Sequence, residues 1–481
     1  MKLSFWGLLI ALLAAITLSA CINDDFDSSS TNALSFSTDT VAFDTVITLQ
    51  QTATKQMVVY NKSDKQVKIS SISVAGLAEK GKFYLNVDGQ KGESFNDIEI
   101  RGKDSIYVFI EAYFNEMQKD DPTMMTDRID FVTNNSTQSV VLTAWGQDVI
   151  RLYGDTISSN TTFTAGKPYL IYDTLFVSPN VTLTINAGAT LLFHDKGAMR
   201  VAGRMLANGT QEKPITFRGD RLDHVVGSIS FDIMSGQWGG IIFTPPTMGN
   251  ELRYVNMRGS SIGMNCSATD TTQRCLYLYN CLLHNSAACC LAAAGCWIDA
   301  VGTEFSNAAE ELFYMAGCKV NAAQCTFANY YLFTSENLPL LTLDEAQLVY
   351  PDGTTVNLQN KVRFDNCIIY PYSTANAVVS PTNFDGKDVM FRYCLFRSNG
   401  TDDSNFINCV WDSDPLFYAD RDEYIFDFRL QEGSPAIGAG NASLCPTNAN
   451  YDRYGNYRFV AGGTGVDIGA YAYSASDTPT N

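Results

Sequence analysis

Carboxylate and guanidinium groups are the side chains whose types and spacing in this sequence could do chemistry. The candidates are Asp402, Asp403, Asp412, Asp414, Arg363, Arg392 and Arg397. Paired carboxylates hydrolyse glycosidic bonds, and carboxylates that hold Ca²⁺ beside an arginine or lysine base support elimination from a polysaccharide. Acids in short motifs are also typical of turns, where they accept backbone hydrogen bonds. We favour turns and assign no catalytic residue. Ca²⁺ is expected only if the protein is a lyase, and otherwise no cofactor.

Aromatic side chains form a second candidate set, because their faces can stack on sugar rings or contact a protein partner. The set is Trp238, Tyr330, Tyr331, Tyr370 and Tyr372. Core packing is the competing interpretation for each of them.

Thirteen cysteines could bind metal or form disulfides, and eight of them lie between Cys266 and Cys325. Metal sites typically use Cys-x-x-Cys pairs with a histidine nearby, whereas the adjacent pair Cys289–Cys290 and three scattered histidines do not provide that spacing. We therefore predict no metal site. We expect buried free thiols that pack as small hydrophobic side chains.

The N-terminus has the pattern of an export signal. Lys2 precedes the apolar stretch 3–16, which is too short to span a bilayer, and Leu18-Ser19-Ala20-Cys21 ends the pattern with small residues. The tetrapeptide resembles the lipobox of bacterial lipoproteins. That resemblance implies a signal peptide over residues 1–20 and attachment of acyl chains such as palmitate to Cys21. An ordinary signal peptide is the alternative.

Residues 21–32 contain Asp24, Asp25 and Asp27 followed by three serines, which is typical of a flexible tether. The acidic run also resembles the export signal of surface lipoproteins of Bacteroidota type. That resemblance implies an outer-membrane protein that faces the cell exterior.

Residues 33–148 contain about seven short runs of alternating apolar and polar residues separated by turn residues. This pattern predicts an immunoglobulin-like β-sandwich. No cysteine lies between Ile22 and Asn265, so apolar packing alone must hold the two sheets together.

A repeat of about 22 residues dominates the next region. Its columns are Leu283, Phe305 and Phe327; Asn285, Asn307 and Asn329; Cys281, Thr303 and Cys325; and Cys275, Cys296 and Cys318. Alternation within each repeat puts every second side chain inward, and each strand would pair in parallel with its counterpart one coil later. We predict a parallel β-helix over residues 149–434 with a loop insertion near 335–361. Asparagine suits the positive-φ turns, and its amides could stack along the axis.

These repeats resemble the right-handed β-helix family that includes pectate lyases, polygalacturonases and non-catalytic surface proteins. Residues 435–481 resemble the module that closes many exported β-helices, on the strength of Gly433–Gly440 at its start and Val466–Tyr471 within it. The resemblance implies that this module covers the open end of the helix, with Asp452, Arg458 and Asp467 as structural charges. The Asn-Thr-Asp and Gly-His-Gly signatures of polygalacturonases are absent from the sequence.

Composition limits the classes of partner. The net charge is -18, which disfavours nucleic acid, and hydrophobic residues make up 46% against 17% charged, which excludes disorder for most of the chain. We expect a non-enzymatic, lipid-anchored scaffold or binding subunit of an outer-membrane protein complex for assembly or uptake. The alternative is a cell-surface protein that binds or cleaves a polysaccharide as a lyase or hydrolase. An acidic groove with an arginine would favour the alternative, and a broad apolar patch would favour the scaffold.

Overall fold

The computed structural model describes residues 26–29, 34–226, 229–268, 270–333, 338–349, 353–373, 378–381, 383–460 and 465–476. The chain divides into two compact units, Met1–Asp148 and Val149–Asn481. Cys21 and the predicted signal peptide lie outside the described residues. Within the described part of the chain, no helix is long and apolar enough to cross a membrane.

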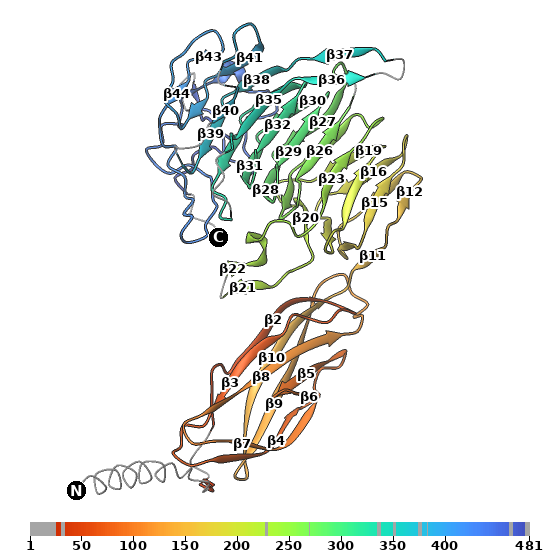
Figure 1. The fold of residues 1–481 in the computed structure, drawn as a ribbon, viewed down its shortest axis with the longest axis vertical. Coiled ribbons are helices and arrows are strands. Elements are labelled where there is room, and N and C mark those ends of the chain that lie inside the picture. Colours follow the sequence, from red (N-terminus) through yellow and green to blue (C-terminus); the bar gives the residue numbers. More distant parts are fainter. Residues whose placement is uncertain are drawn as a thin grey trace, which may run out of the picture. The chain divides into compact units, whose positions relative to one another are not determined.

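The first unit is a sandwich of two five-stranded sheets (Figure 1). One sheet contains, in order, β1 (Ser35–Phe36), β3 (Lys55–Tyr60), β8 (Ser105–Phe114), β5 (Gly81–Val87) and β6 (Gln90–Gly92). The other contains β2 (Thr40–Ile47), β10 (Ser136–Gln147), β9 (Thr123–Thr133), β4 (Val67–Val74) and β7 (Ser94–Ile100). Neighbouring strands are antiparallel except β2 and β10, which pair in parallel. Apolar side chains such as Phe83, Phe114 and Phe131 fill the core.

The second unit winds through three long parallel sheets. The 11-stranded sheet contains β11 (Ile150–Leu152), β14 (Tyr169–Ile171), β17 (Thr190–Phe193), β20 (Ile215–Gly219), β25 (Val255–Arg258), β28 (Leu282–Ser286), β31 (Glu304–Ala308), β34 (Thr326–Asn329), β39 (Ile368–Pro371), β42 (Leu395–Phe396) and β44 (Val410–Trp411). The nine-stranded sheet contains β12 (Thr156–Ile157), β15 (Thr174–Val177), β18 (Ala198–Val201), β23 (Gly240–Phe243), β26 (Met264–Ser267), β29 (Leu291–Ala294), β32 (Phe313–Ala316), β35 (Leu341–Asp344) and β40 (Val379–Ser380). The ten-stranded sheet contains β13 (Thr161–Phe163), β16 (Thr182–Asn186), β19 (Arg204–Asn208), β24 (Asn250–Arg253), β27 (Arg274–Tyr279), β30 (Trp297–Val301), β33 (Lys319–Ala323), β38 (Lys361–Asp365), β41 (Asp388–Arg392) and β43 (Phe406–Ile407).

Each complete coil contributes one strand to each sheet, and Figure 1 shows β23, β26, β29 and β32 as neighbouring parallel arrows. The prediction of an all-β chain with a sandwich followed by a parallel β-helix is therefore confirmed.

The first predicted column of the repeat is a register of paired strands. Leu283 pairs with Phe305 and Phe305 with Phe327, so the 22-residue period is one coil in this part of the helix. The rings of Phe305 and Phe327 stack with centroids 4.7 Å apart inside the core. Asn285 and Asn307 adopt φ of 63° and 54°, as expected for turns. Their amides bond to the backbone at Asp232 and Tyr330.

Two coils are longer because the chain leaves the helix and returns. Phe217 pairs with Met257, and the intervening chain contains β21 (His224–Val226), β22 (Ile229–Ser230) and the short 3₁₀ helix η1 (Phe231–Ile233). Phe327 pairs with Ile369, and the intervening chain contains the hairpin of β36 (Ala346–Val349) and β37 (Thr355–Leu358).

The C-terminal segment packs against the outer face of the 11-stranded sheet. Its apolar residues Phe417, Phe428 and Tyr471 form one cluster with Ile368 and Tyr370 of β39, which point away from the interior. It also contains the 3₁₀ helix η2 (Ala442–Leu444) and the paired strands β45 (Gly440–Asn441) and β46 (Gly465–Val466). The family resemblance instead implied that this segment covers the open end of the helix.

The predicted structural charges of the C-terminal segment hold its backbone. Asp452 accepts hydrogen bonds from the backbone N–H groups of Tyr454, Asn456 and Ala472. Asp467 accepts from two further backbone N–H groups, and the buried Arg458 donates to two backbone carbonyls. The structural interpretation of these three charges is therefore confirmed.

Candidate functional site

Three of the five predicted aromatic residues come together on the outer face of the 11-stranded sheet. Tyr370 lies in β39, Tyr330 follows β34 and Tyr372 follows β39. The Tyr330 ring centroid lies 5.1 Å from that of Tyr372 and 6.5 Å from that of Tyr370. These rings line a cleft of about 550 Å³, which we call the tyrosine cleft. Its other lining residues are Ser373, Arg397, Asp414, Ala419, Asp420, Arg421 and Asp422.

Strand pairing places Arg397 over Tyr370. Because Ile369 of β39 pairs with Phe396 of β42, the next residues of the two strands are also neighbours. The guanidinium carbon of Arg397 lies 4.9 Å from the Tyr370 ring centroid, and Arg397 also donates hydrogen bonds to the carbonyls of Pro371 and Tyr372. The register and the cation–π contact fix the position of this arginine.

The opposite wall of the tyrosine cleft comes from the segment after β44. Asp420 accepts hydrogen bonds from the N–H groups of Asp422 and Glu423, which forms a tight turn at the tip of this segment. Arg421, within that turn, lies 4.9 Å over the Tyr372 ring and donates to the carbonyl of Tyr331 at 3.0 Å. The wall therefore presents both a guanidinium group and carboxylates to the cleft.

The phenol groups of Tyr330 and Tyr370 remain protonated at neutral pH. Burial raises the pKa of Tyr370 to about 12, the negative charge of Asp414 adds to that rise, and Arg397 opposes it. Burial likewise raises the pKa of Tyr330. Tyr372 is 42% exposed. The cleft thus combines hydroxyl donors, three carboxylates, two arginines and an accessible tyrosine, which suits a polar ligand such as a sugar.

Trp238 and Tyr331 do not line this cleft. Trp238 is 0% exposed, stacks on Phe193 with centroids 4.0 Å apart and donates its indole N–H to the carbonyl of Arg258 at 2.8 Å. It must therefore be removed from the predicted contact residues, because its ring is part of the β-helix core. The Tyr331 hydroxyl lies 2.6 Å from the hydroxyl of Ser235.

Most of the predicted carboxylates and arginines have structural partners. Asp402 accepts from a backbone N–H and an indole N–H, and Asp403 accepts from two backbone N–H groups. Asp412 occupies a turn with φ of 46°. Arg363 and Arg392 form ion pairs with aspartates of the paired strands β38 and β41. Of the seven candidates, Asp414 and Arg397 line the tyrosine cleft.

A second polar cluster, which is not among the predicted site residues, lies on the same face of the sheet. His284 Nδ1 lies 2.8 Å from Ser306 Oγ, Ser306 donates to Glu304, and Glu304 also accepts a hydrogen bond from the hydroxyl of Tyr471. All four side chains are buried. His284 pairs with Ser306 one coil later, so the 22-residue period could have identified this contact.

A pocket of about 500 Å³ lies beside this cluster, and we call it the histidine pocket. It is lined by Ile229, Ser230, Asp232, Ile233, Arg258, Leu282, His284, Glu304, Glu423, Tyr424, Phe426, Asp427, Phe428, Tyr454 and Tyr471. The two sites share one segment of the chain, because Asp422 lines the tyrosine cleft and the next residue, Glu423, lines the histidine pocket.

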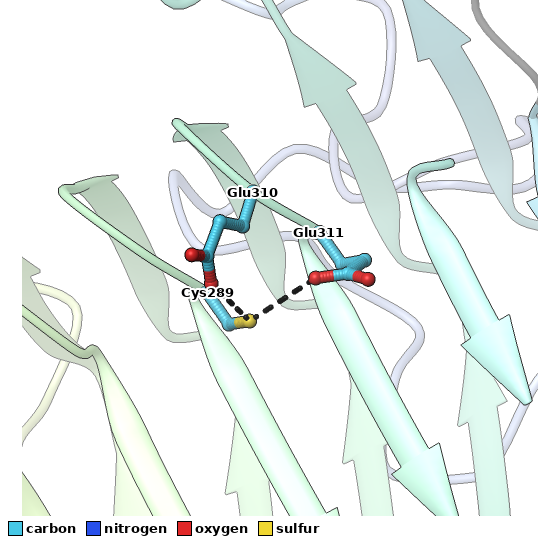
Figure 2. Close-up of side chains that lie close together, drawn as sticks. All are labelled: Cys289, Glu310 and Glu311. Carbon is cyan, nitrogen blue, oxygen red and sulfur yellow. Dashed lines mark hydrogen bonds between the residues drawn. The ribbon is translucent and has the colours of Figure 1, made fainter. Parts of the chain in front are cut away.

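Cys289, Glu310 and Glu311 form the arrangement that most resembles a metal site among the described residues (Figure 2). One ligand atom from each lies within 4.8 Å of the others. The Cys289 sulfur lies 3.7 Å from a carboxylate oxygen of Glu310 and 3.5 Å from one of Glu311, and burial together with both carboxylates raises the pKa of the thiol. In the described part of the chain, these three side chains are the group that could hold a metal ion.

Comparisons with known proteins place this chain in no family. No family model and no curated protein matches it. It is similar to the E. coli chaperone DraB (13% identity, TM-score 0.17), covering 24% of this chain and 55% of DraB. It is also similar to a protein of unknown function from Porphyromonas gingivalis W83, at 10% identity and a TM-score of 0.18. The match covers 26% of this chain and 60% of that chain.

A family 123 glycoside hydrolase from Clostridium perfringens is also similar, at 8% identity and a TM-score of 0.18, with coverage of 27% of this chain and 30% of the hydrolase. The chain thus spans less than two thirds of each of these proteins. TM-scores this low carry no argument about function.

Proposed function

We propose that this chain is a surface lipoprotein whose β-helix binds a polysaccharide in the tyrosine cleft. The observation that carries the proposal is the convergence of Tyr330, Tyr370 and Tyr372 with Arg397 and Asp414 in one cleft of about 550 Å³. A groove with acids and an arginine is the feature that distinguishes glycan binding from a purely apolar docking surface.

Binding without cleavage fits the chemistry of the cleft better than catalysis does. Its arginines already donate to backbone carbonyls, as Arg397 does to Pro371 and Arg421 does to Tyr331. Asp420 stabilises its own turn. The arginines and Asp420 hold the walls in place, and the tyrosine hydroxyls and the Asp414 carboxylate are available to the hydroxyl groups of a sugar.

The membrane anchor of the proposal is lipid on Cys21. Several acyl chains on one residue would hold the protein at a membrane, because each buried methylene contributes about 0.8 kcal/mol. The acidic residues after Cys21 support an outer-membrane location that faces the exterior. Mass spectrometry of the mature N-terminal peptide tests this directly: diacylated Cys21 is expected, and a free cysteine within an uncleaved chain would contradict it.

Polysaccharide binding is tested by affinity electrophoresis of the purified full-length protein through gels that contain individual polysaccharides. We expect retardation by at least one polysaccharide, and we expect Tyr372→Ala to abolish it. Tyr153→Ala is the matched control, because Tyr153 is an exposed tyrosine of the same unit outside the cleft. Equal retardation of both variants, or no retardation in any gel, would remove the cleft as a glycan site.

A scaffold role in an outer-membrane protein complex is the second candidate, and one feature of the sandwich favours it. Tyr107 is 52% exposed and Tyr84 is 38% exposed on the sheet that contains β5 and β8, and the Tyr107 ring stacks with that of Phe109. Exposed aromatic rows are enriched in protein interfaces. A stoichiometric outer-membrane protein that co-purifies in mild detergent and is lost on Tyr107→Ser would support this role.

A further inference from the structure

The histidine pocket is built by one column of side chains along the outer face of the 11-stranded sheet. Arg258 of β25 pairs with His284 of β28, and His284 pairs with Ser306 of β31. Coils lie about 4.8 Å apart, so these three side chains are neighbours along the axis. The loop with η1 and the segment at residues 423–428 close the pocket from the sides.

Hydrogen bonding defines which nitrogen of His284 carries its proton. Ser306 has a single hydroxyl proton, and it gives that proton to Glu304. The Ser306 oxygen therefore accepts a hydrogen bond from His284 Nδ1, which lies 2.8 Å away. It follows that Nδ1 carries the ring proton. Nε2 then has a lone pair and acts as an acceptor. Burial, with the nearby charge of Arg258, lowers the pKa of His284 and keeps the ring neutral.

Charges around the pocket leave Arg258 without a hydrogen-bonded partner, although Glu304 and Glu423 also line the pocket and Arg258 lowers the pKa of Glu304 against the larger effect of burial. Asp232 pairs with Arg218 at 2.8 Å, and Asp427 pairs with Arg429 at 2.6 Å. Glu304 accepts two hydroxyl protons, and burial raises its pKa. Within the described residues, the guanidinium of Arg258 has no hydrogen bond or ion pair. A half-buried arginine of this kind favours an anionic ligand.

We propose that the histidine pocket binds a small organic anion that also carries a hydroxyl group. Arg258 pairs with the anionic group, and His284 Nε2 accepts a hydrogen bond from the hydroxyl. The carbon skeleton of the ligand packs against Phe426, whose ring centroid lies 5.6 Å from that of His284. Ser306 and Glu304 act as positioning residues, because they fix the tautomer of His284. This site is distinct from the tyrosine cleft and does not depend on the function proposed for it.

Isothermal titration calorimetry of the full-length protein in detergent at pH 7 and low salt tests the proposal with three probes. Gluconate has a charge and hydroxyl groups, hexanoate has a charge alone, and sorbitol has hydroxyl groups alone. We expect gluconate to bind with one-to-one stoichiometry and both other probes to bind more weakly. Arg258→Gln should weaken gluconate binding about 10-fold or more, as expected for loss of a charged hydrogen-bond partner.

Further variants separate the proposed roles. Ser306→Ala should weaken gluconate binding about fivefold through loss of tautomer control and leave hexanoate binding unchanged. Arg200→Gln, at an exposed arginine on β18, and Tyr372→Ala, in the tyrosine cleft, should bind gluconate like the wild type. The proposal is overturned if gluconate does not bind at millimolar concentrations, if hexanoate binds equally well, or if Arg258→Gln has no effect.

A spectroscopic measurement on the unaltered protein guards against a variant that fails to fold. In ¹⁵N-histidine-labelled protein, the resonances of His284 are assigned by their loss in His284→Gln. We expect the Nδ1-protonated tautomer in the free protein and a shift of the Nε2 resonance as gluconate is added. The opposite tautomer, or a resonance that gluconate leaves unchanged, contradicts the assignment.

Discussion

His284 and Ser306 lie 22 residues apart in the sequence and occupy the same position in successive coils, with Nδ1 2.8 Å from Oγ. The same outward-facing column continues through Ala328 to Tyr370. Arg258 precedes His284 in this column. One row of the 11-stranded sheet therefore provides residues to both the histidine pocket and the tyrosine cleft, and the segment around residues 417–430 lies between the two.

The buried histidine predicts a specific pH dependence of stability. The folded-state pKa of His284 lies well below 6.5, so its contribution to stability is fully present above pH 6.5 and is lost as the pH falls toward the folded pKa. Arg258, Ser306 and Phe426 surround the ring, and the charge of Arg258 adds to the effect of burial. We expect the wild type to lose up to about 1.4 kcal/mol of unfolding free energy per pH unit below 6.5 relative to His284→Gln.

Urea unfolding of both proteins between pH 7.5 and 5.5 measures this difference. Glu304 acts in the opposite direction, because its raised pKa gives stability that is present below pH 4.5 and lost as the pH rises. The comparison with His284→Gln removes the contribution of Glu304 if its pKa is the same in both proteins. Parallel pH profiles for the two proteins would show that His284 is not held neutral.

The phenylalanine ladder should dominate the stability of the β-helix. Phe305 is fully buried, and its ring stacks on that of Phe327 with an interplanar angle of 3°. Phe305→Ala should cost about 3–5 kcal/mol in the free energy of unfolding, because it removes a large apolar side chain and leaves a cavity. Tyr153→Ala, at a position that is 65% exposed, should change it by about 0.5 kcal/mol or less. A similar cost for both changes would place Phe305 outside the core.

The regular coils could be predicted from the sequence because their chemistry is local and repeated. Leu283, Phe305 and Phe327 recur at a fixed period and alternate with polar residues, so both the inward face and the coil length can be read directly. The same counting aligns His284 with Ser306, but the significance of that pair depends on Glu304 and on Tyr471 from the C-terminal segment.

The tyrosine cleft was only partly predictable. Tyr330 and Tyr372 are neighbours because β34 pairs with β39 across the inserted hairpin of β36 and β37, and that insertion breaks the period. Their second wall depends on a C-terminal segment that folds back over the sheet, for which no local pattern exists. Trp238 was misassigned because the sequence does not reveal that its ring stacks on Phe193 within the helix.

The cysteines should be chemically silent in the folded protein. All twelve described cysteines are free. Cys409 and Cys445 are half-buried, and the other ten are buried. Burial raises the pKa of Cys281 to about 11 and that of Cys318 to about 11, so these two thiols remain protonated at pH 8. We expect at most the two half-buried thiols to react with a thiol reagent in the native protein. All twelve should react after unfolding without reductant, and a smaller number would reveal disulfides.

Arg458 should control attachment of the C-terminal segment to the sheet. Its side chain is 0% exposed, and its guanidinium donates to the carbonyls of Gly469 at 2.8 Å and Ala470 at 2.6 Å. The N–H of Ala470 in turn donates to Thr326 of β34 at 2.9 Å. Arg458→Met should remove both of these charged hydrogen bonds to buried carbonyls and cost about 3 kcal/mol.

Hydrogen exchange followed by mass spectrometry locates that effect. Peptides from residues 465–476 should exchange faster in Arg458→Met, whereas peptides from the interior strands β31 and β34 should keep their protection, because their ladder bonds do not involve Arg458. Arg200→Met is the control at an exposed arginine. Faster exchange throughout the β-helix would mean that the segment stabilises the coils themselves, and unchanged exchange at residues 465–476 would mean that Tyr471 and Thr326 hold the segment without Arg458.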